Sequence, residues 1–347
     1  MKIAIWGSLN YGNFGDDVMN VIFALEVQKM GATPYLYRLD KGLAKQYGLH
    51  TVDNLDDLLK DASFSFIGGG SWLESRKLGD AYEKDFDDYL DKLEHYKVPF
   101  YAISIGGDSV VDKNLLTEDR IRLFSSPLFK GGTVRLREAV ELLGQFDKKV
   151  ELFPDIVLRS SEYFLSQNST PSNTGNKFRI GISWSASKHV RKLMHIIKFT
   201  PLIYDKYEIF FLNTHLPKYN MQYEESFNIK SEKINNFQYE NLEGFYDFIK
   251  SLDCVISSKL HPGVAGLSCK VPFFWIPGYD KTRSFLKSVD LAEYEFTEWE
   301  IIKLLLSKNI VGLAQSYDFK ELENLQTESV GHINYIQDII TEFGHDI

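Results

Sequence analysis

The chain alternates throughout between short apolar runs, loops that contain glycine, and segments with helical periodicity. Apolar runs predict strands at 2–6, 63–67 and 99–105, and each of them stops at one or more glycines. Helical patterns follow, as at 18–30 and 82–96. A chain that repeats strand, loop and helix in this order is expected to form parallel sheets covered by helices on both faces.

The length of 347 residues exceeds one ordinary domain and suits two. The segment 166–177 is rich in Ser, Asn and Thr and reads as a linker, and a fresh strand pattern begins directly after it. We therefore predict two Rossmann-like α/β domains, at 1–165 and 178–329, facing a shared cleft as in the GT-B architecture. The helix at about 330–347 is a candidate to pack back on the first domain.

Composition excludes several classes of protein. A net charge of −9 argues against binding nucleic acid, and no apolar run is long enough to span a membrane. The N-terminus lacks a signal-peptide pattern, so we expect a cytoplasmic protein. Cys254 and Cys269 lie in apolar surroundings and are expected to be buried, reduced thiols. No metal-ligand cysteine spacing occurs, so no metal site is expected.

The stretch 253–286 carries the strongest chemical pattern. A strand pattern ends at Ser257-Ser258, and Lys259 and His261 follow before a segment of small residues with helical length. Cations and an imidazole at the end of a parallel strand, just before a helix, are typical of an anion site. The predicted anion-binding residues, which include cations that follow two other strands, are Ser258, Lys259, Lys281, Arg283 and Lys188. His261 is placed for proton transfer.

Two loops of the first domain carry polar groups and glycines. Loop 7–17 holds Asn13 and the pair Asp16-Asp17, of which one is expected to cap a helix and the other to act as a base. In loop 68–74, a ligand is expected to approach Gly69 and Gly70, with the Trp72 ring as a face for a sugar and Glu74 as a carboxylate. A core position for Trp72 is the alternative. Arg135 is interpreted as a salt-bridge residue, and Asp155 as a helix cap or a site carboxylate.

The order of these motifs resembles one enzyme family. GNFGDD, FIGGGSWLE, SIGGDS, VRLREAVELL, FPD and SSKLHPGVAGLSCKVPFFWIPGYDK, over roughly residues 7 to 290, look like the polysaccharide pyruvyl transferase family. The resemblance implies a GT-B-like fold and transfer of a pyruvyl group from phosphoenolpyruvate to two sugar hydroxyls of a cell-surface polysaccharide, or exopolysaccharide, or its precursor. The product is a ketal, phosphate is released, and no metal or redox cofactor is expected.

The resemblance also assigns roles. The family's Arg-x-His element corresponds to Lys259-Leu260-His261, with lysine in place of arginine, and the arginine that the family often carries after the first strand of the second domain falls in a neighbourhood that reads Ser183-Trp184-Ser185. We expect His261 as the general acid and Asp16 or Asp17 as the base. The donor is expected to be bound by Lys259 and Lys281, with Lys188 or Arg283, and the acceptor to be oriented by Asn13, Trp72 and Glu74.

The acceptor is a saccharide, with a lipid-linked form left open, and so is peripheral association with the inner face of a membrane. Two other functions fit the same pattern. One is a GT-B glycosyltransferase that uses a nucleotide sugar, and the other is a non-catalytic protein of polysaccharide assembly.

Overall fold

The computed structural model describes residues 1–7, 9–75, 80–107, 110–166, 177–183, 188–219, 235–278 and 280–345. The chain divides into two compact units. Unit 1 comprises Met1–Gly12, Asp16–Ile156 and Thr327–Ile347, and unit 2 comprises Asn13–Gly15 and Val157–Gln326. The division falls at 156/157, earlier than the predicted 165, and the C-terminal segment belongs to unit 1. The predicted linker lies almost wholly outside the described residues, as do residues 184–187 and the last two residues of the loop 106–109.

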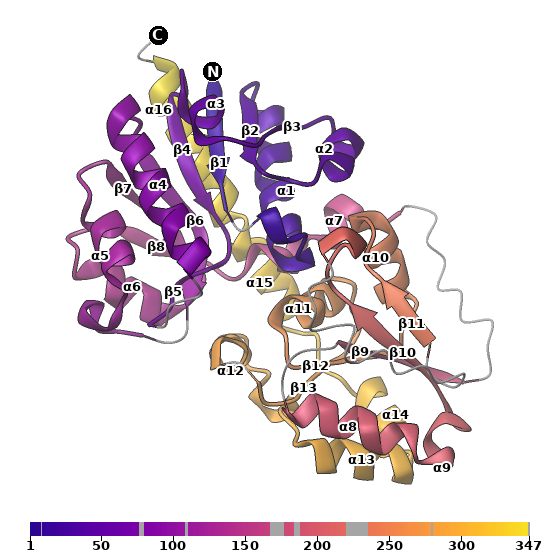
Figure 1. The fold of residues 1–347 in the computed structure, drawn as a ribbon. Coiled ribbons are helices and arrows are strands. Elements are labelled where there is room, and N and C mark those ends of the chain that lie inside the picture. The colour runs from indigo at the N-terminus through magenta and orange to yellow at the C-terminus, as the bar shows by residue number, and fades with distance from the viewer. Residues whose placement is uncertain are drawn as a thin grey trace. The chain divides into compact units, whose positions relative to one another are not determined.

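Unit 1 is built on a parallel sheet (Figure 1). Its strand order is β3-β2-β1-β4-β6-β7-β8, and β5 pairs with β6 beside this path. The strands are β1 (Lys2–Trp6), β2 (Thr33–Tyr37), β3 (His50–Val52), β4 (Phe64–Gly68), β5 (Ser71–Leu73), β6 (Phe100–Gly107), β7 (Phe129–Val134) and β8 (Val150–Leu152). The central strands β4 and β6 are buried along their whole length, as expected for strands with helices on both sides.

The helices of unit 1 alternate with these strands, and the C-terminal helix returns to the same unit. They are α1 (Phe14–Lys29), α2 (Lys41–Tyr47), α3 (Leu55–Leu59), α4 (Asp80–Tyr96), α5 (Glu118–Ser125), α6 (Arg137–Gly144) and α16 (Gly331–His345). Side chains fix where some of them begin. The Asp40 carboxylate accepts hydrogen bonds from the amides of Gly42 and Leu43, and Asn54 accepts one from Asp57 at 2.7 Å.

Unit 2 repeats the same plan with a smaller parallel sheet of order β11-β10-β9-β12-β13. Its strands are β9 (Phe178–Ser183), β10 (Tyr207–Asn213), β11 (Asn235–Gln238), β12 (Cys254–Ser257) and β13 (Phe273–Trp275). Its helices are α7 (Ser161–Phe164), α8 (Lys188–Lys198), α9 (Pro201–Tyr204), α10 (Leu242–Lys250), α11 (Leu260–Ser268), α12 (Asp280–Ser288), α13 (Glu298–Ser307), α14 (Asn309–Gln315) and α15 (Leu322–Ser329).

The predicted alternation of strands and helices is confirmed. The segment after β13, Asp280–Ser288, forms a helix. Between β9 and β10 the chain forms α8 and α9 with a break before Pro201, because a proline disfavours helical backbone at the preceding residue. Cys254 and Cys269 are free and buried, and burial raises the pKa of both thiols, that of Cys269 to about 12.

In each sheet, the direction in which successive strands are added reverses at one point. In unit 1 the reversal lies between β1 and β4, and in unit 2 between β9 and β12. Ligands of open parallel sheets bind beyond the carboxyl ends of the strands at such points. Within the described ranges, every helix is too short or too polar to cross the hydrocarbon core of a bilayer.

Candidate functional site

The reversal point of unit 2 collects small polar side chains at the strand ends. Ser183 ends β9 and Ser257 ends β12, and the two are register partners. Helix α11 begins three residues after Ser257, and Lys259 stands at its N-cap without a side-chain capping bond. The first amides of α11 therefore have no side-chain acceptor from the cap residue. A helix start of this kind favours an anion.

Lys259 is held in place by three hydrogen bonds. Its backbone amide donates to Ser257 Oγ at 2.9 Å, and Ser257 Oγ donates back to the Lys259 carbonyl at 2.8 Å. Its Nζ donates to Thr214 Oγ1 at 2.9 Å. Thr214 follows β10, and no sequence pattern pointed to it. The ammonium group of Lys259 is thus positioned by the residue that follows β10.

The predicted first-domain loop enters unit 2 through the three residues Asn13–Gly15. The amide of Phe14 donates to the Thr214 carbonyl at 2.9 Å, and Asn13 forms an isolated antiparallel bridge with His215. The Phe14 ring is fully buried and stacks on Phe245 with a centroid distance of 4.0 Å. Backbone and ring contacts together fix this segment beside the strand that carries Thr214.

Gly15 leaves the space that the His261 imidazole occupies. A Cβ atom on Gly15 would lie 1.9 Å from His261 Nδ1 and 2.6 Å from its Cγ, far inside van der Waals contact. Only glycine therefore fits beside the ring in this position. The GNFG and KLH segments, which lie far apart in the sequence, are direct neighbours in unit 2, and the next residue in the chain is Asp16.

The loop between β13 and α12 lies against the same strand end. A Cβ on Gly278 would approach Ser258 Cβ at 2.7 Å, so this loop touches the residue before Lys259. Lys281 follows in the first turn of α12 and is partly buried. The Arg283 guanidinium bonds to the Glu295 carboxylate at 2.7 Å and lies over the Trp275 ring. Arg283 is therefore engaged within the fold, which favours a structural role for it.

Three buried polar atoms near these strand ends have no hydrogen-bond partner among the described residues: Ser183 Oγ, Trp275 Nε1 and Thr282 Oγ1. Buried polar atoms are rarely left unsatisfied, because each costs about 1–3 kcal/mol. A polar ligand bound at these strand ends could supply the hydrogen bonds that these atoms lack. The described residues contain no cluster of His, Cys, Asp or Glu suited to a metal ion.

The basic residues of α8 differ in their ion pairs. Lys188 is the first residue of the helix and is exposed. His189 and Lys192 instead bond to the buried carboxylate of Glu298, at 2.8 and 3.0 Å. The donor-binding role of Lys188 stays a prediction.

In unit 1, Asp16 and Asp17 occupy the first turn of α1, where the helix dipole favours carboxylates. They differ in access, because Asp16 is partly exposed and Asp17 is fully buried. Asn20, one turn on, donates to the carbonyls of Asp16 and Gly68, at 2.8 and 3.2 Å, and so joins α1 to the end of β4. Of the two aspartates, only Asp16 presents itself to solvent.

The prediction of a sugar-stacking face on Trp72 is wrong. Its side chain is 1% exposed and packs in the core of unit 1 with Trp6, Phe86 and, through Trp6, Tyr89. The alternative of a core position is the correct one. Glu74 is also buried, with 3% exposure.

Gly69 and Gly70 are shaped by packing. Both have positive φ, at 57° and 85°, which other residues rarely adopt. A Cβ on Gly69 would meet the Met19 side chain at 2.7 Å, and one on Gly70 would meet Trp72 Nε1 at 2.7 Å. The space expected for a ligand is thus filled by the protein's own side chains.

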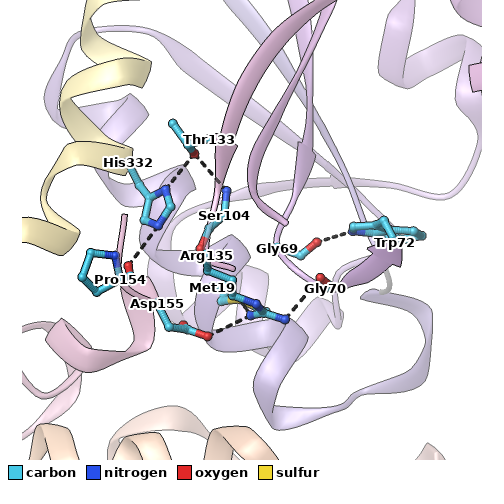
Figure 2. A network of polar contacts seen from close by, with 10 residues as sticks. All are labelled: Met19, Gly69, Gly70, Trp72, Ser104, Thr133, Arg135, Pro154, Asp155 and His332. Atoms are coloured by element: carbon cyan, nitrogen blue, oxygen red, sulfur yellow. Dashed lines mark hydrogen bonds and ion pairs between the residues drawn. The ribbon is translucent and has the colours of Figure 1, made fainter. Parts of the chain in front are cut away.

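Arg135 forms the centre of a buried network (Figure 2). It pairs with Asp155 at 3.0 Å and donates to the Gly70 carbonyl and Met19 Sδ, each at 3.2 Å. The predicted salt bridge is confirmed, although it is buried within unit 1 instead of lying on a surface or between domains. It connects α1, the loop after β4, the end of β7 and the segment after β8.

His332 extends this network to the C-terminal helix (Figure 2). Its Nε2 lies 3.0 Å from the Pro154 carbonyl, which can only accept, and its Nδ1 lies 2.7 Å from Thr133 Oγ1. Nε2 therefore carries a proton. Burial, aided by the nearby Arg135 charge and opposed by the Pro154 hydrogen bond, lowers the pKa of His332 to about 3.

Comparison with known proteins identifies the family. The sequence profile of polysaccharide pyruvyl transferases matches residues 13–278, which begin at Asn13 and end at Gly278. The chain belongs to the polysaccharide pyruvyl transferase family. Comparison with curated protein sequences finds no significant match. The family assignment makes the protein a transferase of polysaccharide biosynthesis.

Solved structures with the same fold are nucleotide-sugar enzymes. The UDP-GlcNAc 2-epimerase of Methanocaldococcus jannaschii matches with a TM-score of 0.60 and 10% identity over 92% of this chain and 94% of that one. S. aureus MnaA, solved with UDP, gives 0.62 and 11% over 98% and 97%. Anabaena HepE, solved with UDP-glucose, gives 0.58 and 12% over all of both chains. Identities this low establish the fold alone, which is the GT-B fold.

Replacing Gly15 with alanine is expected to displace the His261 ring and to lower the turnover of the enzyme roughly 100-fold, as misplacement of a reacting group by about 1 Å can do. The measurement is the initial rate together with the far-UV circular dichroism of the variant. Gly144→Ala is the matched control, because a Cβ on Gly144 meets no atom within 4 Å. Full activity in Gly15→Ala would contradict the placement of His261.

The lowered pKa of His332 predicts that the free energy of unfolding depends on pH. The unfolded chain binds a proton at His332 below about pH 6.5, whereas the folded chain does so only near pH 3. Stability should therefore be complete above pH 6.5 and fall as the pH is lowered, by up to about 1.4 kcal/mol per pH unit. Urea unfolding between pH 7 and 5 should show a smaller slope in His332→Gln. The exposed His95→Gln variant serves as the control, and equal slopes in all three proteins would refute the assignment.

Proposed function

We propose that this protein transfers the pyruvyl group of phosphoenolpyruvate to two hydroxyls of a saccharide, forming a cyclic ketal and releasing phosphate. The family assignment supports the transferase class. The observation that carries the proposal is the contact between Gly15 and His261, which brings the two family motifs of this chain together in unit 2. The two motifs meet at a strand end suited to an anion, which supports one site formed by both.

Phosphoenolpyruvate is a small molecule with a carboxylate and a phosphate. The start of α11 offers backbone amides, and Lys259 beside it offers a positive charge. The Ser183 hydroxyl at the neighbouring strand end supplies a further polar group. These groups support binding of a compact anion, and Lys281 at the adjoining helix start is the second cation of the proposed site.

His261 is proposed to protonate the donor. The electron pair of the donor's C=C bond takes the imidazolium proton at the methylene carbon, and C2 becomes an oxocarbenium-like centre. The first sugar hydroxyl forms a bond from its oxygen to C2 and gives its proton to a base. The bond from C2 to the phosphate oxygen then breaks, phosphate leaves with the electron pair, and the second hydroxyl closes the ketal and loses its proton.

Asp16 is the candidate base, since Asp17 is buried and Asp16 is not. It directly follows Gly15 in the chain, and Gly15 touches the proposed acid. Asn13, bridged to His215 in unit 2, remains a candidate to orient the acceptor. Trp72 is excluded from that role by its position in the core. The acceptor is proposed to be a saccharide, free or lipid-linked.

Removal of the acid should stop the reaction without unfolding the protein. His261→Ala is expected to reduce phosphate release from phosphoenolpyruvate by about 10²–10⁴-fold, the usual contribution of general acid catalysis. The assay supplies phosphoenolpyruvate with a panel of oligosaccharide and lipid-linked acceptors, and the release must depend on the acceptor. His195→Ala, on the exposed side of α8, is the control. Near-normal activity in His261→Ala would remove the imidazole from the mechanism.

The charge of Lys259 should matter for donor binding more than for the chemical step. Lys259→Met is expected to raise the KM for phosphoenolpyruvate by about 10- to 100-fold, the value of a hydrogen bond to a charged group, whereas Lys259→Arg keeps the charge and should lose less. Thermal-shift titration compares phosphoenolpyruvate with UDP-glucose. Stabilisation by UDP-glucose alone would replace the proposal with a nucleotide-sugar transferase, and stabilisation by neither would favour a non-catalytic role.

A further inference from the structure

Unit 2 carries an unusual group of exposed apolar side chains. Phe199, Leu202, Trp299 and Leu306 are 65%, 61%, 52% and 39% exposed. They come from two separate segments, the α8–α9 region and α13. Single exposed apolar residues need no explanation, but four large ones gathered on one end of a domain are typical of a surface that binds something.

Contacts between the segments show that these side chains share one region. Lys192 of α8 lies over the Trp299 ring at 4.4 Å, and the Glu298 carboxylate bonds to His189 and Lys192. At the other end, Lys206 Nζ donates to the Leu306 carbonyl at 3.0 Å, just after α9. Helix α13 therefore runs beside the α8–α9 segment from its first to its last turn, as Figure 1 also shows.

The same region is basic in a protein of net charge −9. Helix α8 holds Lys188, Arg191, Lys192 and Lys198 and no acidic residue. Arg191, His195 and Phe199 are exposed and follow one another at intervals of four residues, so they continue one face at the end of α8. Leu202 is exposed on the next helix, α9. Lys303 is exposed on α13 between Trp299 and Leu306. The acidic residues of α8, α9 and α13 are the buried Glu298 and Glu300, which bonds to its own helix cap Thr297. The exposed Asp205 directly follows α9.

We propose that this face, formed by Phe199, Leu202, Trp299 and Leu306 with Arg191 and Lys303, docks on the anionic surface of a phospholipid bilayer. Aromatic and aliphatic side chains beside Lys and Arg are the combination that binds at the boundary of headgroups and acyl chains. The cations attract acidic headgroups, whereas the remainder of this net-negative protein is repelled by them. A protein partner would have to be acidic to match the same cations, and the self-association of a basic face with its own copy brings like charges together.

The test is co-sedimentation of the full chain with vesicles of phosphatidylcholine, with and without phosphatidylglycerol. We expect binding to the vesicles that contain phosphatidylglycerol and weaker binding as salt is raised. The triple variant Phe199→Ser/Leu202→Ser/Trp299→Ser should lose at least ten-fold in partitioning. Arg191→Gln should lose about five-fold, the effect of one cation near such a surface. None of these measurements depends on phosphoenolpyruvate or on turnover.

Leu115→Ser is the matched control, because Leu115 is 57% exposed and belongs to unit 1. It should bind vesicles as the unchanged chain does. Absence of binding to the phosphatidylglycerol vesicles, or full binding by the triple variant, would overturn the proposal. Light scattering that shows a dimer in the unchanged chain and a monomer in the triple variant, with no vesicle binding in either, would assign the face to a second copy.

Discussion

The docking of Asn13–Gly15 into unit 2 is the interaction on which the candidate site depends. Phe14 is buried between Tyr239, Phe245 and Tyr246, and replacing such a ring with alanine typically costs about 3–5 kcal/mol. This buried ring fixes the position of the residues on either side of it. Residue 13 bridges to a strand end, and residue 15 leaves room for an imidazole. The apolar packing of Phe14 thus holds Gly15 beside the His261 imidazole.

Much of the fold was predictable because it rests on local pattern. Apolar runs that end in glycine gave the strands, and the KLH segment at the end of β12 could be placed at the carboxyl edge of a sheet without coordinates. The contact of Gly15 with His261 could not be predicted, since it joins segments that lie far apart in the sequence and depends on how a loop packs. Thr214 escaped notice for the same reason. A threonine after a strand has no distinctive pattern, and only the position of Lys259 Nζ gives it a role.

Unit 1 shows why a glycine-rich loop is ambiguous. Glycine allows another group to approach the backbone closely. That group can be a ligand or a side chain of the same protein, and the sequence does not distinguish the two. At Gly69 and Gly70 the approaching groups are Met19 and Trp72. The carbonyl of Gly70 then accepts from the buried Arg135, which pairs with Asp155. A buried charge stays only where its partners are complete, so this loop is rigid scaffold that holds the first turns of α1 in place.

The replacement of arginines at the proposed donor site has a physical consequence. The resemblance predicts arginine where this chain has Lys259 and in the neighbourhood of Ser183, so a bidentate fork and a second cation are exchanged for an ammonium and a hydroxyl. The exchange removes a bidentate hydrogen-bonding geometry as well as a positive charge, because a guanidinium can bond to both oxygens of a carboxylate and an ammonium cannot do so in the same way. We propose that the backbone amides at the start of α11, together with the Thr214 contact that orients Lys259, compensate for part of this loss. An anion held mainly by oriented dipoles and hydroxyls is screened less by salt than one held by exposed cations. The proposed site therefore depends more on the packing of α11 against β12 and β13, which Gly266 and Gly263 permit, than on the number of its positive charges.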